Sequence, residues 1–309
     1  MKKLIALLLV LAMAFAMAAC GGNDAQEPAA NAPQDTDDAP DAPADTTPDD
    51  AGSVEPADDN AEDAAGSTSD LASVQNKGTL VVGITDFAPM DYRAEGSDEW
   101  IGFDADMAKL FAESLGVAVE FTEITWDYKV MELDSGSIDC VWNGMTLNDE
   151  VRAAMEVSNP YCLNAQVLVV PAGKAADFEG LTSLEGLTIA VESGSAGEDA
   201  AEALGAATVP VQAQSNTLME VSAGTADAAV IDLLMAGAMI GEGTSYEDLT
   251  IALNLNELQG LTSEEYGVGF RKGSDLAGAL NTFLAEKIED GTLREVAETY
   301  GLQESVVLE

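Results

Sequence analysis

The chain has 309 residues, with 56 Asp and Glu against 12 Lys and Arg and a formal net charge of −44. Such a negative field repels nucleic-acid phosphates and argues against a nucleic-acid partner. The sequence contains no histidine, which removes the commonest general base, the Ser-His and Cys-His nucleophile pairs and most zinc sites. We therefore expect no metal and no cofactor, although an enzyme that uses carboxylates alone stays open.

The first twenty residues have the layout of an export signal. A basic start is followed by an apolar run over residues 4–17 and by two alanines before Cys20. The run is shorter than the ~20 residues that a membrane-spanning helix needs. We expect a signal peptide over residues 1–19, with a buried helix as the alternative.

The junction at Cys20 carries a second signal. Met-Ala-Ala-Cys-Gly at 17–21 resembles the lipobox of bacterial lipoproteins, with Met17 in the place of the usual Leu. The resemblance implies cleavage before Cys20 and attachment of diacylglycerol to its thiol. We expect this lipid to hold the protein on the outer face of the cytoplasmic membrane.

Residues 20–70 differ sharply from the rest of the chain. Beyond Cys20 the segment consists largely of Ala, Pro, Asp, Glu, Thr and Ser, with no Lys or Arg. It cannot bury enough apolar surface to offset its chain entropy, and its carboxylates repel one another. We expect a disordered acidic tether that lifts a folded body above the membrane. A specific cation-binding tail is the less favoured alternative.

The body that begins at residue 71 is itself acidic. Fifteen of the 56 carboxylates lie in residues 21–70 and two of the 12 basic residues precede Cys20, which leaves 41 against ten. The body is long enough for one large domain or two small ones. Cys140 and Cys162 either form a bridge or stay reduced; both flank apolar strand-like runs, so we favour two buried thiols.

Strand-like and helix-like segments alternate along the body. The helix that follows the first strand shows the clearest pattern, because Phe103, Met107 and Phe111 recur at helical spacing and Gly116 follows its end. Strands are expected at residues 79–84, 117–121, 138–142, 165–170, 187–191, 209–211, 228–231 and 266–270. Helices are expected at residues 103–115, 128–133, 200–204, 216–223, 233–240, 276–289 and 293–300.

This alternation predicts an α/β fold with parallel sheets covered by helices on both faces. Ligands of such sheets bind beyond the carboxyl ends of the strands. The pattern restarts near residue 187, so it predicts two units with a cleft between them.

Several short motifs follow one another in the body. They are Phe-Ala-Pro-Met at 87–90, Gly-Phe-Asp-Ala-Asp at 102–106, Leu-Asp-Ser-Gly-Ser-Ile-Asp at 133–139, Asn-Gly-Met-Thr at 143–146, Ser-Asn-Pro-Tyr at 158–161, Gly-Thr-Ala-Asp-Ala at 224–228 and Glu-Tyr-Gly at 265–267. In this order, the chain resembles the polar amino acid-binding proteins of ABC transport, solute-binding protein family 3. The resemblance runs to the C-terminus.

The resemblance implies a periplasmic-binding-protein-like type II fold, in which two α/β lobes are joined by two extended crossings. The crossings correspond to residues near 165–169 and 262–266. Lobe 1 would then comprise residues 71–164 and 266–309, with residues 165–265 in lobe 2. A ligand that touches both lobes closes the hinge by favouring the closed state.

The resemblance also implies the function. The protein would be the extracytoplasmic solute-binding component of an ABC importer, capturing an amino acid or a closely related small solute for a permease and, through it, an ATPase. We expect a monomer and a binding protein that is not an enzyme.

Aromatic residues are the first candidates for the ligand site. The resemblance places Phe87, after the first strand, over the ligand side chain; a core phenylalanine is the alternative. Trp126 and Trp142 each stand next to a predicted strand end. They are wall candidates, weighed evenly against ordinary core packing.

Lobe 1 is expected to hold the ligand carboxylate. The resemblance assigns this role to the Thr146 hydroxyl and to the backbone at Gly144. The family's carboxylate-binding arginine falls on Val151, and Arg152 comes one residue late. One residue turns a side chain by ~100° along a helix, so Arg152 supplies the clamp only with local adjustment, and a solvated surface arginine is the alternative.

Lobe 2 is expected to supply backbone donors and an acid. The loop Glu-Ser-Gly-Ser-Ala-Gly at 192–197 joins a strand to a helix, so N–H groups near Ser195 and Ala196 can meet a carboxylate. A plain turn is the alternative. The resemblance assigns the ligand α-ammonium group to Asp232, for which a helix N-cap is the alternative.

Two other functions stay open. A few proteins of this fold resemble cyclohexadienyl dehydratases, which act through a positioned carboxylate, and Glu192 or Glu198 could serve in that way. A ligand sensor or adhesion lobe is the second alternative; such chains commonly carry a fused transmembrane or enzymatic domain, which we do not expect here.

Overall fold

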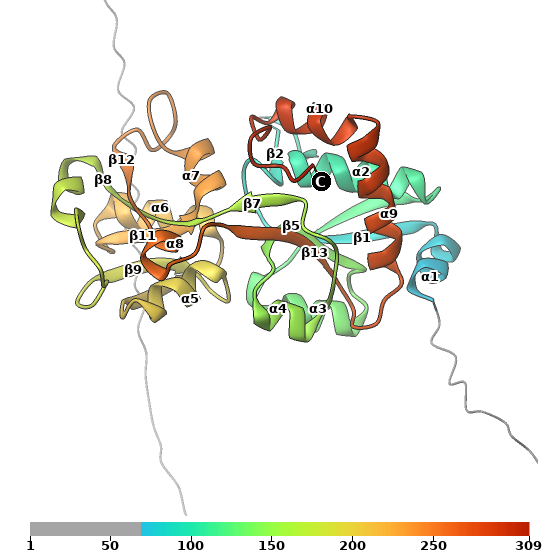
Figure 1. Ribbon diagram of the computed structural model, residues 1–309, viewed down its shortest axis with the longest axis horizontal. Coiled ribbons are helices and arrows are strands. Elements are labelled where there is room, and N and C mark those ends of the chain that lie inside the picture. Colours follow the sequence, from blue (N-terminus) through green and yellow to red (C-terminus); the bar gives the residue numbers. More distant parts are fainter. Residues whose placement is uncertain (1–68, 95, 309) are drawn as a thin grey trace, which may run out of the picture. The chain divides into compact units, whose positions relative to one another are not determined.

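The computed structural model describes residues 69–94 and 96–308 (Figure 1). The predicted signal peptide, the lipid anchor at Cys20 and the tether as far as residue 68 lie outside the described residues. Within the described part, no helix combines the length and the apolar character that crossing a membrane requires.

The first of two main sheets has the strand order β4-β1-β5-β13-β6, and β7 also pairs with β13. Its strands are β1 (Thr79–Ile84), β4 (Ala118–Glu123), β5 (Cys140–Thr146), β6 (Glu156–Val157), β7 (Cys162–Asn164) and β13 (Glu264–Phe270). Its helices are α1 (Asp70–Lys77), α2 (Phe103–Ser114), α3 (Lys129–Ser135), α4 (Asp149–Ala154), α9 (Leu276–Glu289) and α10 (Thr292–Thr299), with a short 3₁₀ turn at Trp126–Tyr128. A hairpin of β2 (Tyr92–Arg93) and β3 (Trp100–Ile101) lies beside them. We call this unit lobe 1.

The second sheet has the order β10-β9-β11-β8-β12. Its strands are β8 (Gln166–Pro171), β9 (Thr188–Glu192), β10 (Ala207–Val211), β11 (Ala228–Asp232) and β12 (Leu249–Asn254). Its helices are α5 (Ala196–Ala203), α6 (Gln214–Ala223), α7 (Leu233–Met239) and α8 (Leu255–Gln259), with a 3₁₀ segment at Ala172–Phe178. We call this unit lobe 2.

Two extended segments connect the lobes (Figure 1). Strand β7 ends at Asn164 and β8 begins at Gln166, so a single residue separates a strand of one sheet from a strand of the other. The return passage enters β13 at Glu264, which pairs with Asn164 in an antiparallel register. The two passages therefore lie side by side and hydrogen-bond to each other.

The predicted α/β class is confirmed, whereas the predicted parallel sheets are parallel only in part. Strands β4, β1 and β5 run parallel, as do β10, β9 and β11. Strand β13 is antiparallel to β5, and β8 is antiparallel to both β11 and β12. A parallel neighbour needs a crossover that returns the chain to the same end of the sheet. The inter-lobe strands enter directly from the other lobe, so no crossover reverses them.

Helix α2 shows how the sequence pattern becomes packing. Phe103, Met107 and Phe111 are fully buried on one face, and each contributes roughly 1.5–3 kcal/mol by leaving water. The ring of Phe111 lies 6.2 Å from that of Trp142 on β5 and 5.3 Å from that of Phe283 on α9. The helix therefore joins the sheet to the C-terminal helices.

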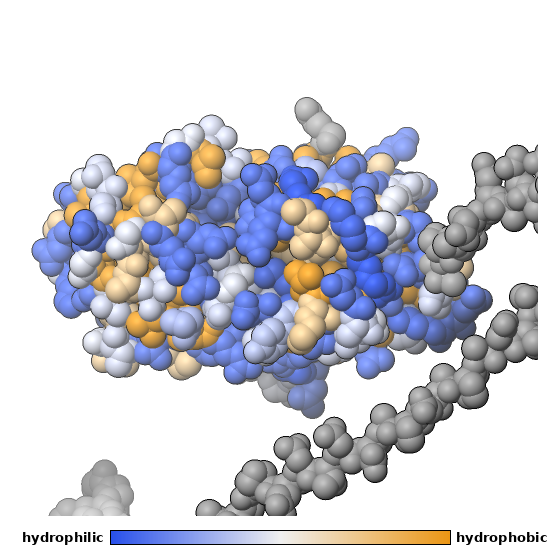
Figure 2. Space-filling model, turned by 90° about the horizontal axis from the view of Figure 1, so that it is seen from below, coloured by the Kyte–Doolittle hydropathy of each residue, from blue (hydrophilic) through white to orange (hydrophobic). Residues whose placement is uncertain are grey.

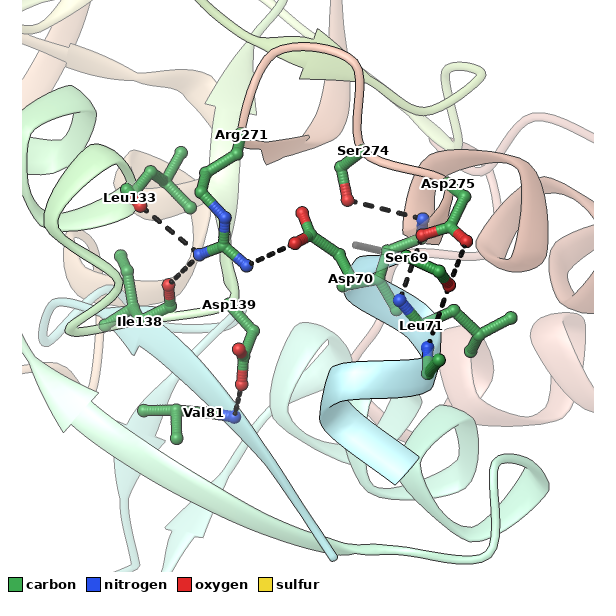
Figure 3. A network of polar contacts seen from close by, with 12 residues as sticks. Ser69, Asp70, Leu71, Val81, Leu133, Ile138, Asp139, Arg271, Ser274 and Asp275 are labelled. Carbon is green, nitrogen blue, oxygen red and sulfur yellow. Dashed lines mark hydrogen bonds and ion pairs between the residues drawn. The ribbon is translucent and has the colours of Figure 1, made fainter. Parts of the chain in front are cut away.

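A polar network attaches α1 to the segment that follows β13 (Figure 3). The guanidinium of Arg271 lies 3.0 Å from the carboxylate of Asp70 and donates to the backbone oxygens of Leu133 (3.3 Å) and Ile138 (3.0 Å). Asp275 accepts hydrogen bonds from two residues at the start of α1. These contacts join segments that are far apart in the sequence.

The surface reflects the acidic composition. Hydrophilic residues predominate on the face in Figure 2, and hydrophobic ones are scattered among them. Cys140 and Cys162 are both buried and unbridged, as favoured from the sequence. Burial raises the pKa of Cys162 to about 12, so its thiol stays neutral.

Candidate functional site

A cleft between the two lobes encloses about 830 Å³, part of which is open to solvent. Both sheets point the carboxyl ends of parallel strands at it, namely β5 from lobe 1 and β9 and β11 from lobe 2. Seven of the nine predicted ligand-binding residues line the cleft: Phe87, Trp126, Gly144, Thr146, Ser195, Ala196 and Asp232. Their role in binding stays a prediction.

Phe87 lies in the loop between β1 and β2 and is only 2% exposed. Its ring meets the edge of the Tyr266 ring at 6.4 Å between centroids and lies against Gly144. A Cβ on Gly144 would stand 2.3 Å from a ring carbon of Phe87, and the φ of Gly144 is +56°. Glycine at this position therefore lets the aromatic wall lie against β5.

The two predicted carboxylate donors of lobe 1 already have partners. The backbone N–H of Gly144 donates to Asp104 at 2.6 Å, and the Thr146 hydroxyl donates to Glu264 at 3.1 Å. Burial raises the pKa of Asp104 to about 7, against hydrogen bonds from Tyr161 and Gly144 that lower it. A ligand carboxylate would have to compete for both donors.

Trp142 and Arg152 are the two predicted residues that do not line the cleft. Trp142 is 1% exposed and packs against Phe111 and Tyr161. It is therefore a core residue, which was the alternative weighed from the sequence. The Arg152 Nε donates to the backbone oxygen of Leu147 at 3.0 Å, and its Nη2 lies 3.2 Å from Glu265. Arg152 stands one residue after the position that the resemblance gives to the family's arginine. Its side chain lies at the surface, which was the alternative stated from the sequence.

Val151 occupies the place that the family resemblance gives to arginine, and it lines the cleft. Its side chain is 6% exposed and belongs to an apolar cluster with Trp126 and Met145. Helix α4 therefore presents an apolar surface where a carboxylate clamp was expected. Among the described residues, no arginine lines the cleft.

Asp232 is the last residue of β11 and is 6% exposed. Its carboxylate accepts hydrogen bonds from Asn164, from Gln166 at 3.1 Å, from Gln214 at 2.5 Å and from the Tyr266 hydroxyl at 2.7 Å. Burial raises the pKa of Asp232, and these four donors oppose the shift. No side-chain cap bond is made to α7, although Asp232 occupies the N-cap position.

The partners of Asp232 connect the cleft to the inter-lobe strands. Asn164 belongs to β7, Gln166 to β8 and Tyr266 to β13. Gln166 also donates to Glu264 at 2.9 Å, so both crossing strands enter the network. A ligand that takes up hydrogen-bonding capacity of Asp232 would therefore act directly on the residues that join the lobes.

Glu192 is a cleft residue that the sequence reasoning named only as a conceivable catalytic acid. It is the last residue of β9, is 4% exposed and lines the cleft. Its Oε1 has no hydrogen-bond partner among the described residues. Burial and, next, the charge of Asp232 raise the pKa of Glu192 to about 8. Like Asp232, Glu192 is a carboxylate at the end of a parallel strand, and this shared local feature could have drawn attention to it.

Lys129 was missed and makes a direct contact between the lobes. Its Nζ donates to the backbone oxygen of Gly194 at 2.9 Å and lies 4.9 Å from the centre of the Trp126 ring. Burial lowers the pKa of Lys129, although four neighbouring carboxylates oppose the shift. Gly194 also lies against Asp127, because a Cβ there would stand 2.8 Å from the Asp127 carboxylate.

The loop at the start of α5 is ordered by its own side chains. The Ser195 hydroxyl accepts from the backbone N–H of Glu198 at 3.1 Å, and the Glu198 carboxylate accepts from that of Gly194 at 2.8 Å. These two bonds fix the turn before α5 in the manner of a capping box, and Ser195 and Ala196 of this turn line the cleft. Within the described ranges, no group of three or more potential metal-ligating side chains is found.

Comparison with known families agrees with this architecture. The family of bacterial extracellular solute-binding proteins, family 3, matches residues 80–303. The chain belongs to this family. The match begins within β1 and ends beyond α10, so it covers both sheets and the cleft between them.

Individual relatives of this family-3 protein are known from several bacteria. The L-cystine-binding protein TcyJ of Escherichia coli is 28% identical over 239 residues, covering 74% of this chain and 85% of its own. The arginine-binding extracellular protein ArtP of Bacillus subtilis is 27% identical over 240 residues, covering 75% and 90%. The match to each of these two relatives leaves about a quarter of this chain uncovered.

Solved structures of similar proteins share the fold. A mutant of ArgBP from T. maritima has a TM-score of 0.67 at 30% identity, covering 75% of this chain and 98% of its own. The ancestral amino acid-binding protein AncCDT-1, described as a precursor of cyclohexadienyl dehydratase, has a TM-score of 0.66 at 30% identity, covering 75% and 99%. The structural neighbours of this family-3 chain thus include a binding protein described as an ancestor of an enzyme.

Proposed function

We propose that the protein is the extracytoplasmic solute-binding component of an ABC importer and that it captures an amino acid or a closely related small solute between its lobes. The observation that carries the proposal is Asp232. It is a buried carboxylate at the end of a parallel strand, it lines the inter-lobe cleft, and it contacts β7, β8 and β13 through hydrogen bonds.

The cleft suits a small ligand with an ammonium group. An ammonium group offers three donors and a full positive charge, which a carboxylate in a desolvated cleft binds strongly. Phe87 and Trp126 supply apolar walls from lobe 1, while Asp232 supplies the charge from lobe 2. Because the ligand touches both lobes, its binding energy favours the closed state.

A thermal-shift screen against the common amino acids tests this proposal. A ligand that binds only the folded protein raises the melting temperature in proportion to the logarithm of its concentration. We expect at least one amino acid to do so, and calorimetry then gives its affinity. Failure of every amino acid and related amine to stabilise the protein would contradict the proposed function.

The partners and the anchor belong to the same proposal. The protein passes its ligand to a membrane permease that is driven by an ATPase, and it acts as a monomer tethered through lipidated Cys20. In cells, Cys20→Ala should move the protein from the membrane fraction to the soluble fraction without changing ligand affinity. Recovery of the Cys20→Ala variant in the membrane fraction would contradict the lipid anchor.

A second candidate function is carboxylate-assisted catalysis, and one specific observation favours it. Glu192 lies in the cleft with its pKa raised by burial to about 8, a value suited to a general acid at neutral pH. The cyclohexadienyl dehydratase of Pseudomonas aeruginosa is 29% identical over 136 residues, which cover 50% of it. Ligand recovered chemically unchanged after long incubation would exclude this second function.

A further inference from the structure

The charges that line the cleft are unusually one-sided. Among the described residues that line it, five are carboxylic acids and one is a cation, Lys129. The acids are Asp127, Glu150, Glu192, Asp199 and Asp232. Charges of one sign in a concave, partly desolvated site favour a ligand of the opposite sign.

One of these acids, Glu192, has an unpartnered carboxyl oxygen. Glu192 is 4% exposed, lines the cleft, and has no hydrogen-bond partner at Oε1 among the described residues. A buried acceptor without a partner costs free energy. A donor brought by the ligand would satisfy it.

Lys129 is already engaged by other groups. Its Nζ donates to Gly194 and lies over the Trp126 ring, and no ion pair joins it to Glu192 in the described part of the chain. The charge of Lys129 lowers the pKa of Glu192, but the effects of burial and Asp232 are larger. A ligand cation would therefore add to Lys129 without needing to displace it.

Glu192 and Asp232 line the same cleft from lobe 2. They are the last residues of β9 and β11, which are neighbouring parallel strands. Neighbouring strands lie about 4.8 Å apart. Asp232 is surrounded by four donors, whereas Glu192 keeps a free oxygen, so the two acids are not equivalent.

On the basis of the proposed function, we propose that the ligand carries a second positively charged group besides the ammonium group at Asp232, and that Glu192 receives it. The ligand class is a small molecule with two positively charged groups, either a basic amino acid or a diamine. The absence of arginine from the described cleft lining and the apolar Val151 in its place fit a ligand that is held mainly by its positive groups. Glu192 is then a specificity-determining residue.

The experiment compares probes that differ in one charge. L-citrulline has the length and planar end of L-arginine without its charge, and L-norleucine lacks only the side-chain ammonium group of L-lysine. We expect calorimetry to show that the charged member of at least one pair binds about tenfold or more tightly, as charge pairs in desolvated sites do. Cadaverine, which lacks the carboxylate of lysine, separates a diamine from a basic amino acid.

Substitution of Glu192 provides the matched test. Glu192→Gln keeps the size of the side chain and should reduce the charged-to-neutral preference to about threefold or less, through weaker binding of the charged probe. Glu202→Gln removes a charge from an exposed position on α5 of the same lobe and should leave the preference unchanged. Melting curves of both variants show that they are folded.

Two results would overturn the inference. Equal or tighter binding of the neutral probes would mean that Glu192 acts as a neutral hydrogen-bond donor. An undiminished charge preference in Glu192→Gln would assign the selectivity elsewhere. In both cases amino-acid capture itself would survive, whereas the failure of every amino acid and of cadaverine to bind would remove the proposed function as well.

Discussion

The two walls of the cleft differ in the charge that they can bind. On the lobe 2 wall, Asp232 and Glu192 end neighbouring strands and offer buried carboxylates. On the lobe 1 wall, the donors of Gly144 and Thr146 are bound to protein acceptors, and Val151 is apolar. The wall that would hold positive charge is complete, while the wall that would hold negative charge is largely missing.

This difference has a physical consequence for specificity. A ligand held at both ends by charge needs an ammonium group and a carboxylate. The groups that line this cleft are suited to bind a positive charge far more strongly than a negative one. Selectivity should therefore depend strongly on lobe 2 and weakly on Arg152. Five predictions test that contrast, from the largest expected effect to the smallest.

Substitution of Asp232 should have the largest effect. Asp232→Ala leaves a ligand ammonium group without its counter-charge in a desolvated site, so the affinity should fall by about two orders of magnitude or more. Calorimetry with the ligand found by thermal shift measures the loss. Asp248→Asn, an exposed acid in the same lobe, is the control. Retained micromolar binding by a folded Asp232→Ala protein would contradict the charge-pair role.

Substitution of Gly194 should interfere with closure. Gly194 has a φ of +71°, and a Cβ there would stand 2.9 Å from the Cα of Asp127 in the other lobe. Gly194→Ala should therefore weaken binding by about tenfold. Gly180→Ala is a matched control, because its φ is +73° but nothing lies within 4 Å of its Cβ. Both variants carry a backbone strain of roughly 1 kcal/mol; equal affinities in the two would show that this contact has no part in closure.

The pH dependence of binding should report Glu192. Burial and Asp232 raise the pKa of Glu192 to about 8, and Lys129 opposes the shift. Below that pH the empty site holds a proton that a ligand cation must displace, so the affinity for a basic ligand should increase with pH by up to about tenfold per unit and level off near 8. Glu192→Gln should flatten this profile. A profile identical in the two proteins would rule out titration of Glu192 on binding.

The raised pKa of Glu192 also predicts how the stability of the empty protein depends on pH. The pKa of Glu192 is about 8 in the folded protein, above its ordinary value of 4.5. Glu192 therefore contributes stability to the empty protein below about pH 4.5, and this contribution is lost as the pH rises toward about 8. The unfolding free energy of the wild-type protein should therefore fall more steeply over this range than that of Glu192→Gln. Denaturant titrations at several pH values measure the difference.

Substitution of Arg152 should have the smallest effect. Its side chain is 43% exposed, its ion-pair partner Glu265 is 47% exposed, and it does not line the cleft. Arg152→Ala should change ligand affinity by less than about twofold and the unfolding free energy by less than about 1 kcal/mol. A tenfold loss of affinity would mean that Arg152 reaches the ligand after all.

Much of the fold followed from local pattern. The predicted strand at 79–84 and the helix at 276–289 coincide with β1 and α9, because a period of two or of 3.6 survives wherever one face is buried. Strands β2, β3, β6 and β7 have only two or three residues each and carry no such signal. Strand β12 and helices α1, α4 and α8 were also absent from the expected elements. The antiparallel direction of β8 depends on its partners in the sheet.

The candidate site was only partly accessible from the sequence. Asp232 was assigned through the family resemblance, and its place at the end of a predicted strand agreed with that assignment. Whether Trp142 faces the cleft or the core depends on Phe111 and Tyr161, which lie far from it in the chain. Lys129 makes its contact with Gly194 across the lobes, and no local pattern encodes such a contact.

A structure of the protein with the ligand identified by thermal shift tests the central claim most directly. We predict a ligand ammonium nitrogen within hydrogen-bonding distance of Asp232 and a second positive group at the free oxygen of Glu192, with both lobes in contact with the ligand. A ligand bound elsewhere, or one whose carboxylate faces lobe 2 while Asp232 keeps only its protein donors, would contradict the account.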